Sequence, residues 1–151
     1  MEIENEAPRV RDWMTVDPIT VEPGRSLSSA RARMEREDVQ RLIVVDMDHR
    51  PLGILSWTDV QKAWPSPFTS LEPFEVRELM ARISVEEAMT KSVITVEPSA
   101  TIAEAVNLMF ESRVGALPVV DESRVVGILT NSDIRQGLVR ILSARRSSDA
   151  A

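Results

Sequence analysis

The sequence predicts a mixed α/β protein made of two copies of one β-α-β-β-α unit. Three observations predict it: segments that recur about 75 positions apart, apolar residues at helical spacing, and short unbroken apolar runs. An apolar run that does not alternate with polar residues is typical of a strand buried on both faces.

The repeat is visible in four segments. Met14-Thr15 recurs as Met89-Thr90, and the run Ile-Thr-Val-Glu-Pro at 19–23 recurs at 94–98. Val-Val-Asp at 44–46 recurs at 119–121, also 75 positions later. The segment 53–60 matches 127–134 at an offset of 74. The one-residue slip falls in a predicted turn around His49, where an insertion costs little. We infer that the chain arose by duplication.

In the first copy, a short strand over 19–22 should end at a proline. A helix should follow, because Leu27, Ala30 and Met34 lie at i, i+3 and i+7. Strands are expected over 42–45 and 52–56. The hydroxyl of Thr58 is the predicted N-cap of a second helix.

The second copy follows the same order. A strand is predicted over 93–97, and Thr101 with Glu104 forms a capping-box pattern at the start of the next helix. Its apolar stripe is expected to contain Ile102, Ala105, Val106 and Met109. Strands over 117–120 and 125–130 follow, then Ser132 as N-cap and a helix over 134–142.

The predicted domain organisation follows these copies. Residues 1–9 are expected to be a flexible N-terminus and 143–151 a flexible tail, because neither shows any periodicity. Residues 10–65 form the first repeat and 84–142 the second. The linker 66–83 should be partly helical, over 75–83, after a proline-rich beginning.

Composition excludes several classes of function. The 24 acidic residues outnumber the 18 basic ones, and the net charge of −6 argues against binding to a nucleic acid duplex. With no cysteine there is no thiolate nucleophile or thiolate metal site, and the single histidine rules out a multi-histidine site. No apolar run reaches the roughly 18 residues of a membrane span. A cytoplasmic protein without a membrane anchor is expected.

The repeated motif Gly-Ile-Leu-[Ser/Thr]-x-[Thr/Ser]-Asp indicates where chemistry should lie. Its glycine allows a close approach to the strand. Its hydroxyls and the helix N-terminus suit a phosphate, and Asp59 or Asp133 suits a ribose diol. The alternative is structural: the hydroxyl caps the helix and the carboxylate complements its dipole.

Taken in order and duplicated, these motifs resemble a pair of cystathionine-β-synthase (CBS) domains, a Bateman module, over about residues 10–142. Val-Gly-Ala-Leu-Pro-Val-Val-Asp at 114–121 and Gly-Ile-Leu-Thr-Asn-Ser-Asp-Ile at 127–134 are its most specific parts. The resemblance implies one disc of two pseudo-symmetric repeats. It also implies two clefts between them that bind AMP, ADP, ATP or S-adenosylmethionine.

Carried over by position, the resemblance assigns a set of residues to each cleft. The Asp133 cleft would be formed by Thr15, Ile19, Thr20, Gln40, Arg41, Ile128, Thr130, Ser132 and Asp133. The Asp59 cleft would be formed by Ile54, Ser56, Thr58, Asp59, Thr90, Ile94, Thr95, Gly115, Ala116 and Pro118.

The two clefts are expected to differ. Arg41 offers a forked cation for phosphate to the Asp133 cleft, whereas Ala116, at the matching position, offers none to the Asp59 cleft. We therefore expect phosphorylated adenosines in the Asp133 cleft, and weaker binding or an uncharged adenosyl group in the other. Trp57 either fills the Asp59 cleft or flanks it.

The function predicted from the residues and the resemblance is a regulatory module that senses an adenosyl ligand. No catalytic residue, metal site or required cofactor is expected, and no membrane partner. A homodimer is expected, with the final helix as a candidate interface and a separate regulated protein as a further partner. The alternatives are a scaffold with vestigial clefts and a nucleotide-processing enzyme, whose only candidate bases are Asp59 and Asp133.

Overall fold

A computed structural model describes residues 7–91 and 93–149, and these form two compact units. Of the described residues, unit 1 takes 7–17, 94–122 and 126–149. Unit 2 takes 18–91, 93 and 123–125. The mixed α/β class predicted from the sequence is confirmed, since each unit combines a three-stranded sheet with helices.

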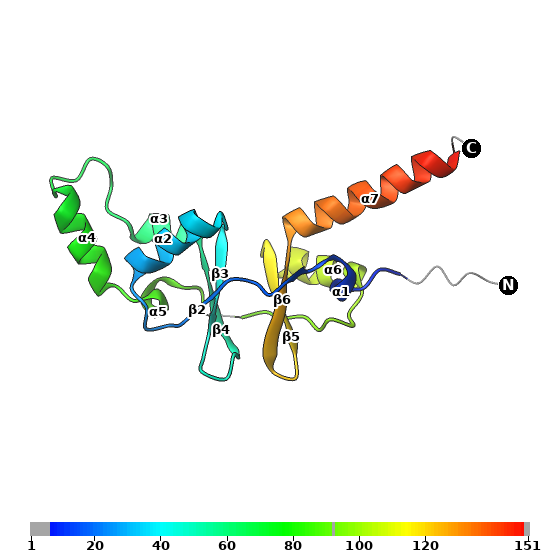
Figure 1. Cartoon of the computed structure of the whole chain (residues 1–151), viewed down its shortest axis with the longest axis horizontal. Helices are drawn as coiled ribbons and strands as arrows, with labels where there is room; N and C mark the ends of the chain where they lie inside the picture. The colour runs from blue at the N-terminus through cyan, green and yellow to red at the C-terminus, as the bar shows by residue number, and fades with distance from the viewer. Residues whose placement is uncertain (1–6, 92, 150–151) are drawn as a thin grey trace. The chain divides into compact units, whose positions relative to one another are not determined.

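Unit 2 contains the first repeat. Its elements are β2 (Thr20–Val21), α2 (Leu27–Glu37), β3 (Arg41–Val45), β4 (Pro51–Ser56), α3 (Trp57–Ala63), α4 (Pro73–Arg82) and α5 (Val85–Ala88) (Figure 1). Strand β3 is central, parallel to β2 and antiparallel to β4. The predicted stripe of Leu27, Ala30 and Met34 is buried against the sheet residues Leu42 and Leu55. Burial of this stripe gives α2 most of its stability.

Unit 1 contains the second repeat. Its elements are α1 (Val10–Trp13), β1 (Thr15–Val16), α6 (Ile102–Ser112), β5 (Ala116–Asp121), β6 (Arg124–Thr130) and α7 (Asn131–Asp149), although the first two residues of β6 are grouped with unit 2. Its strand order is β1-β6-β5, with β1 antiparallel to β6. The core contains Val10 from α1, Met109 from α6, and Leu117, Val119 and Leu129 from the strands. The predicted capping box of Thr101 and Glu104 is present at the start of α6.

The short helices α1 and α5 are exchanged between the repeats. Helix α1 precedes the first repeat but joins unit 1, where the Val10 amide donates to the Ala100 carbonyl at 2.8 Å. Helix α5 precedes the second repeat but joins unit 2, where the Val85 amide donates to the Arg25 carbonyl at 2.8 Å. The compact units therefore differ from the sequence repeats, and the predicted boundaries at 10 and 84 describe the repeats only.

The strand predicted over 93–97 is absent as a strand from the described residues. Only Val96 pairs there, with Val119, through bonds to the Pro118 carbonyl and the Val120 amide. Extending this parallel ladder backwards would need a donor at Pro118, and proline has no N–H. The first repeat has Ile43 at this position, and its amide donates to the Ile19 carbonyl at 3.2 Å. One residue type thus decides between a strand and a single bridge.

Three smaller expectations were wrong. Val106 lies outside the buried stripe of α6 and is 37% exposed. Helix α7 continues past Leu142 to Asp149, because adding residues to an existing helix costs little and its alanine and arginines favour it. At the other end, the Pro8 carbonyl accepts from the Ile102 amide at 2.9 Å, so residues 8–9 are tied to unit 1. Residues 1–6 and 150–151 of the two expected flexible ends lie outside the described residues.

Candidate functional site: two capped helix turns

Each repeated Gly-Ile-Leu motif forms the end of a strand and the first turn of the helix after it. Ser56 and Thr130 cap helices α3 and α7: their side-chain oxygens accept from the amides of Asp59 at 3.1 Å and Asp133 at 3.2 Å. Ser56 has the extended backbone that an N-cap needs, because it also ends β4. The predicted caps, Thr58 and Ser132, were therefore wrong by two residues.

The two aspartates lie at the third helical position and complete these caps. Asp59 Oδ2 accepts from the Ser56 amide at 2.9 Å, and Asp133 Oδ2 accepts from the Thr130 amide at 2.8 Å. Both carboxylates are half-buried. One oxygen of each carboxylate, Oδ2, therefore bonds to the helix terminus, as expected if the aspartates stabilise the helices. The other oxygen, Oδ1, takes no part in the cap.

The two turns differ at this second oxygen. Thr15 Oγ1 donates to Asp133 Oδ1 at 2.9 Å. The counterpart of Thr15 in unit 2 is Thr90, which is bonded to Ile54 through its backbone. Within the described part of the chain, no hydrogen bond reaches Asp59 Oδ1. The Asp59 carboxylate therefore has an acceptor ready for a ligand, whereas that of Asp133 is shared with a hydroxyl.

The glycine of each motif allows the close approach predicted for it, and the approaching group is the chain itself. A Cβ at Gly53 would lie 2.6 Å from the Thr90 carbonyl oxygen. A Cβ at Gly127 would lie 2.7 Å from Met14 Sδ and 2.9 Å from the Thr15 carbonyl oxygen. The repeated Met-Thr pair thus packs across the glycine and brings a threonine to the turn. The sequence showed both motifs but not this contact.

The other predicted site residues are divided between the units. Unit 1 holds Thr15, Ile128, Thr130, Ser132 and Asp133 of one set, and Ile94, Thr95, Gly115, Ala116 and Pro118 of the other. Unit 2 holds Ile54, Ser56, Thr58, Asp59 and Thr90 of one set, and Ile19, Thr20, Gln40 and Arg41 of the other. Within one unit, the structure brings together each aspartate, its cap and its threonine-bearing segment. That the residues of each set from the two units form one cleft stays a prediction.

Arg41 lies beside a turn within its own unit. It is the cross-strand partner of Ser56, and the Gln40 carbonyl accepts from the Trp57 amide at 2.8 Å. The same arrangement recurs in unit 1, where the Gly115 carbonyl accepts from the Asn131 amide at 3.0 Å. Gln40 and Arg41 are thus attached next to the Asp59 turn. Their assignment to the Asp133 cleft stays a prediction.

Trp57 flanks the Asp59 turn. Its ring lies near the Arg31 guanidinium of α2, at 5.6 Å from the ring centre, and packs against the core of unit 2. The pocket that Trp57 lines contains neither Ser56 nor Asp59.

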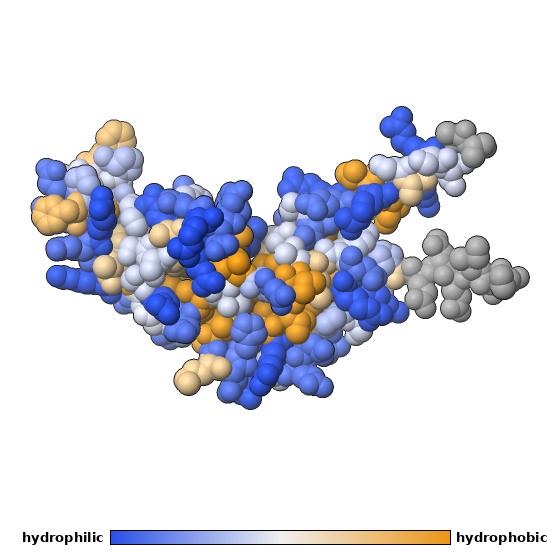
Figure 2. All heavy atoms as spheres, viewed as in Figure 1, coloured by the Kyte–Doolittle hydropathy of each residue, from blue (hydrophilic) through white to orange (hydrophobic). Residues whose placement is uncertain are grey.

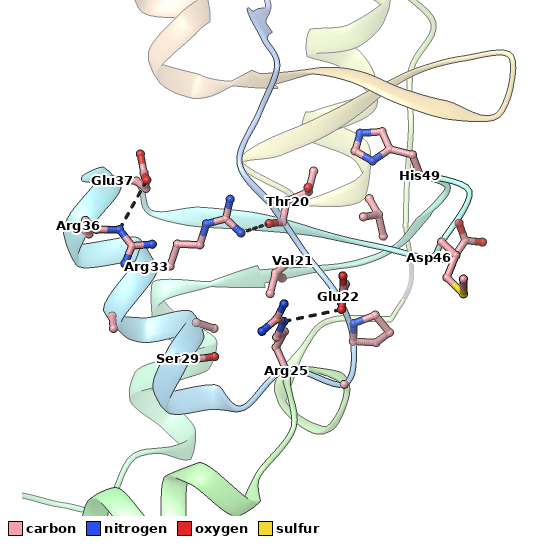
Figure 3. A pocket seen from close by; sticks show the side chains of 16 residues that line it. Thr20, Val21, Glu22, Arg25, Ser29, Arg33, Arg36, Glu37, Asp46 and His49 are labelled. Carbon is pink, nitrogen blue, oxygen red and sulfur yellow. Dashed lines mark hydrogen bonds and ion pairs between the residues drawn. The ribbon is translucent and has the colours of Figure 1, made fainter.

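Unit 2 also has a cavity that is not formed by these turns. It has a volume of about 940 Å³ and lies between α2, β2 and the turn around Asp46 (Figure 3). Its arginines are already engaged: Arg25 pairs with Glu22 at 3.7 Å, and Arg33 donates to the Thr20 carbonyl at 2.7 Å. Of the predicted site residues, only Thr20 lines it. This balance of charges gives the cavity no clear ligand class.

A family comparison identifies the fold. The model of the CBS domain matches residues 10–66 and 85–140, and the chain belongs to this family. The protein MJ1225 of Methanocaldococcus jannaschii is 35% identical over 87% of the chain, which spans 46% of that relative's length. The CBS domain-containing protein DDB_G0289609 of Dictyostelium discoideum is 30% identical, with 88% of this chain and 92% of the relative covered.

Solved structures with the same fold contain adenosyl ligands. The CBS domain pair of protein MJ0100, in complex with 5-methylthioadenosine and S-adenosyl-L-methionine, has a TM-score of 0.72 and 26% identity. The match covers 93% of this chain and 99% of that one. CBSX2 in complex with AMP also has a TM-score of 0.72 and 26% identity, covering 89% and 98% of the two chains. This chain is thus similar to two proteins that bind adenosyl compounds.

Among the described residues, no helix is both long and apolar enough to cross a bilayer.

Proposed function

We propose that this chain is a non-catalytic sensor of an adenosyl ligand: AMP, ADP, ATP or S-adenosylmethionine. The observation that carries the proposal is the pair of capped turns. Each presents a helix N-terminus, a hydroxyl and a half-buried carboxylate whose Oδ1 lies outside the cap. A helix N-terminus attracts phosphate, and a carboxylate oxygen accepts from a ribose hydroxyl. The adenosyl complexes of similar proteins support this choice of ligand.

The signal would arise by linkage between binding and conformation. A ligand held by residues of both repeats favours the conformation in which those residues converge, and it shifts the population by its differential affinity. In this proposal the residues of each cleft come from both units, as the sequence predicts. Signalling to a separate regulated protein, or through a change of oligomeric state, follows from the same linkage. A cytoplasmic location belongs to this proposal, since these ligands are soluble metabolites.

The geometry favours this proposal over an enzyme. Asp59 and Asp133 are the candidate bases, and each is held by its own helix terminus through Oδ2. A scaffold with vestigial clefts remains the second candidate, because the caps alone would explain both aspartates.

A thermal-shift panel tests the proposal. We expect AMP, at about 100 times its dissociation constant, to add about 2.7 kcal/mol of stability, and GMP at the same concentration to add much less. Adenosine should bind more weakly than AMP if Arg41 holds the phosphate, and Arg41→Met should remove this difference. An absence of any shift with AMP, ATP and S-adenosylmethionine would favour the scaffold.

We also propose a homodimer through helix α7. The stripe that packs Ile134 against the core of unit 1 continues along α7 as Leu138, Ile141 and Leu142, which are 48%, 40% and 59% exposed. Figure 2 shows apolar side chains over this helix. Exposed apolar stripes of this kind mark interaction surfaces.

Light scattering on a sizing column tests the dimer. We expect twice the chain mass for the wild type and a shift towards one chain mass for Leu142→Glu, because a buried charge opposes association. Gln136→Glu adds the same charge to α7, on the side that the helical period places away from this stripe, and should leave the mass unchanged. A wild-type protein with the mass of one chain would contradict the proposal.

A further inference from the structure

A second pocket in unit 2 contains neither the cap residue Ser56 nor Asp59, although Trp57 of that turn lines it. It has a volume of about 660 Å³, within the usual range for small-molecule sites. It is lined by residues of α2, α3, α4 and the loop between α3 and α4, which arches between the two helices in Figure 1. Every residue that lines it belongs to unit 2, so the pocket is complete within one compact unit.

Two tryptophans form the apolar wall. Trp57 begins α3 and Trp64 is its C-cap, and both are half-buried, so part of each indole faces the pocket. The Arg31 guanidinium lies over both rings, 4.1 Å from the centre of the Trp64 ring and 5.6 Å from that of Trp57. At these distances the cation and the rings attract each other. The three side chains therefore hold one another in place before any ligand arrives.

The loop that follows Trp64 is restrained by two prolines and two hydrogen bonds. Pro65 and Pro67 fix their own backbone φ angles. The Ser66 side chain accepts from the Phe68 amide at 3.2 Å, and its carbonyl accepts from the Thr69 amide at 2.9 Å. A ligand would therefore lose little affinity to ordering the loop.

The charged side chains that line the pocket are all positive. Arg31 and Arg77 line the pocket, and no aspartate or glutamate does. Arg31 also forms an ion pair with Glu35 on the same helix, at 3.4 Å from Nε to Oε1. Arg77 makes no ion pair among the residues that the structure describes. Since the whole chain carries a net charge of −6, attraction of an anion to this place must come from these two side chains.

We propose that this pocket binds a small planar aromatic anion. Its ring would stack on the exposed parts of the Trp57 and Trp64 indoles, where offset aromatic pairs are favourable. Its carboxylate would accept from the Arg77 guanidinium, whose fork matches that group. The pocket contains neither Ser56 nor Asp59 and shares only Trp57 with the Asp59 turn, so this ligand would not use the oxygen atoms proposed for the adenosyl compound.

Calorimetry and tryptophan fluorescence with 2-naphthoate test the proposal. We expect binding with quenching of the indoles, and affinities about tenfold weaker for 2-naphthalenemethanol, which lacks the charge, and for cyclohexanecarboxylate, which lacks the aromatic ring. Arg77→Met should lower the affinity for naphthoate by about tenfold, because it removes the guanidinium that would hold the carboxylate. Trp64→Leu should also lower the affinity for naphthoate and should remove most of the quenching.

The matched control is Arg82→Met, which removes the same charge from the same helix at an exposed position outside the pocket. It should bind naphthoate as the wild type does. The proposal is overturned by an absence of heat and quenching at about 1 mM naphthoate. It is equally overturned if the uncharged alcohol binds as tightly as naphthoate, or if Arg82→Met lowers the affinity for naphthoate as much as Arg77→Met does.

Discussion

Replacing Gly53 or Gly127 with alanine is expected to destabilise the protein by about 1–3 kcal/mol, towards the upper end for Gly53. The added Cβ at Gly53 would lie 2.6 Å from the Thr90 carbonyl oxygen, and that residue is held by backbone bonds to Ile54 in both directions. A backbone atom in a paired segment cannot yield as a flexible side chain does. Urea or thermal unfolding measures the loss.

Gly24→Ala is the control for this experiment. No atom outside its own chain neighbours lies within 4 Å of the position of its Cβ, so the substitution should change stability by less than about 0.5 kcal/mol. If Gly53→Ala and Gly127→Ala were as harmless as Gly24→Ala, the Met-Thr segments would not lie across these strands.

Asp59→Asn and Asp133→Asn are expected to reduce the stabilisation by AMP, and the double variant should lose nearly all of the roughly 2.7 kcal/mol expected near saturation. The amide oxygen of asparagine still accepts from the cap amide, so the helix terminus is kept. The second acceptor becomes a donor, which cannot serve a ribose hydroxyl in the same way. Thermal shift with and without AMP measures the loss.

Two glutamates provide matched controls for these aspartates. Glu87 and Glu104 close capping boxes at α5 and α6 just as Asp59 and Asp133 do at α3 and α7, and neither belongs to a predicted site. Glu87→Gln and Glu104→Gln should leave the response to AMP intact. If they reduced it as much as the aspartate variants do, the effect would reflect helix stability alone.

Combining Arg41→Met with each aspartate variant tests which of the two sites Arg41 serves as the phosphate-binding cation. The sequence places Arg41 with Asp133, whereas its strand register places it beside Ser56 in unit 2. Variants that act on one site are not additive. Arg41→Met should therefore add little to the variant whose site it serves and should add its full effect to the other.

The sequence predicted the helices and the longer strands well, because their signals are local. The stripe of α2, the capping box at Thr101, and the apolar runs of β3 and β5 are all visible in short windows and were confirmed. The caps of α3 and α7 were placed two residues late. A strand that passes directly into a helix lets its last residue act as the cap, and no spacing in the sequence shows where that happens.

By itself, then, the sequence determined the duplication, the order of elements in the first copy, the fold family and the two turns that carry an aspartate. Only the tertiary structure decided which segments share a unit. Hydrogen bonds from the Val10 and Val85 amides to carbonyls distant in sequence join α1 to the second repeat and α5 to the first. The same level of structure decided that Thr15 reaches Asp133, and that Arg31 lies over two tryptophans in a pocket that Arg77 also lines. The physical reason is that such contacts depend on the approach of residues far apart in the chain, which local patterns of hydrophobicity and capping do not encode.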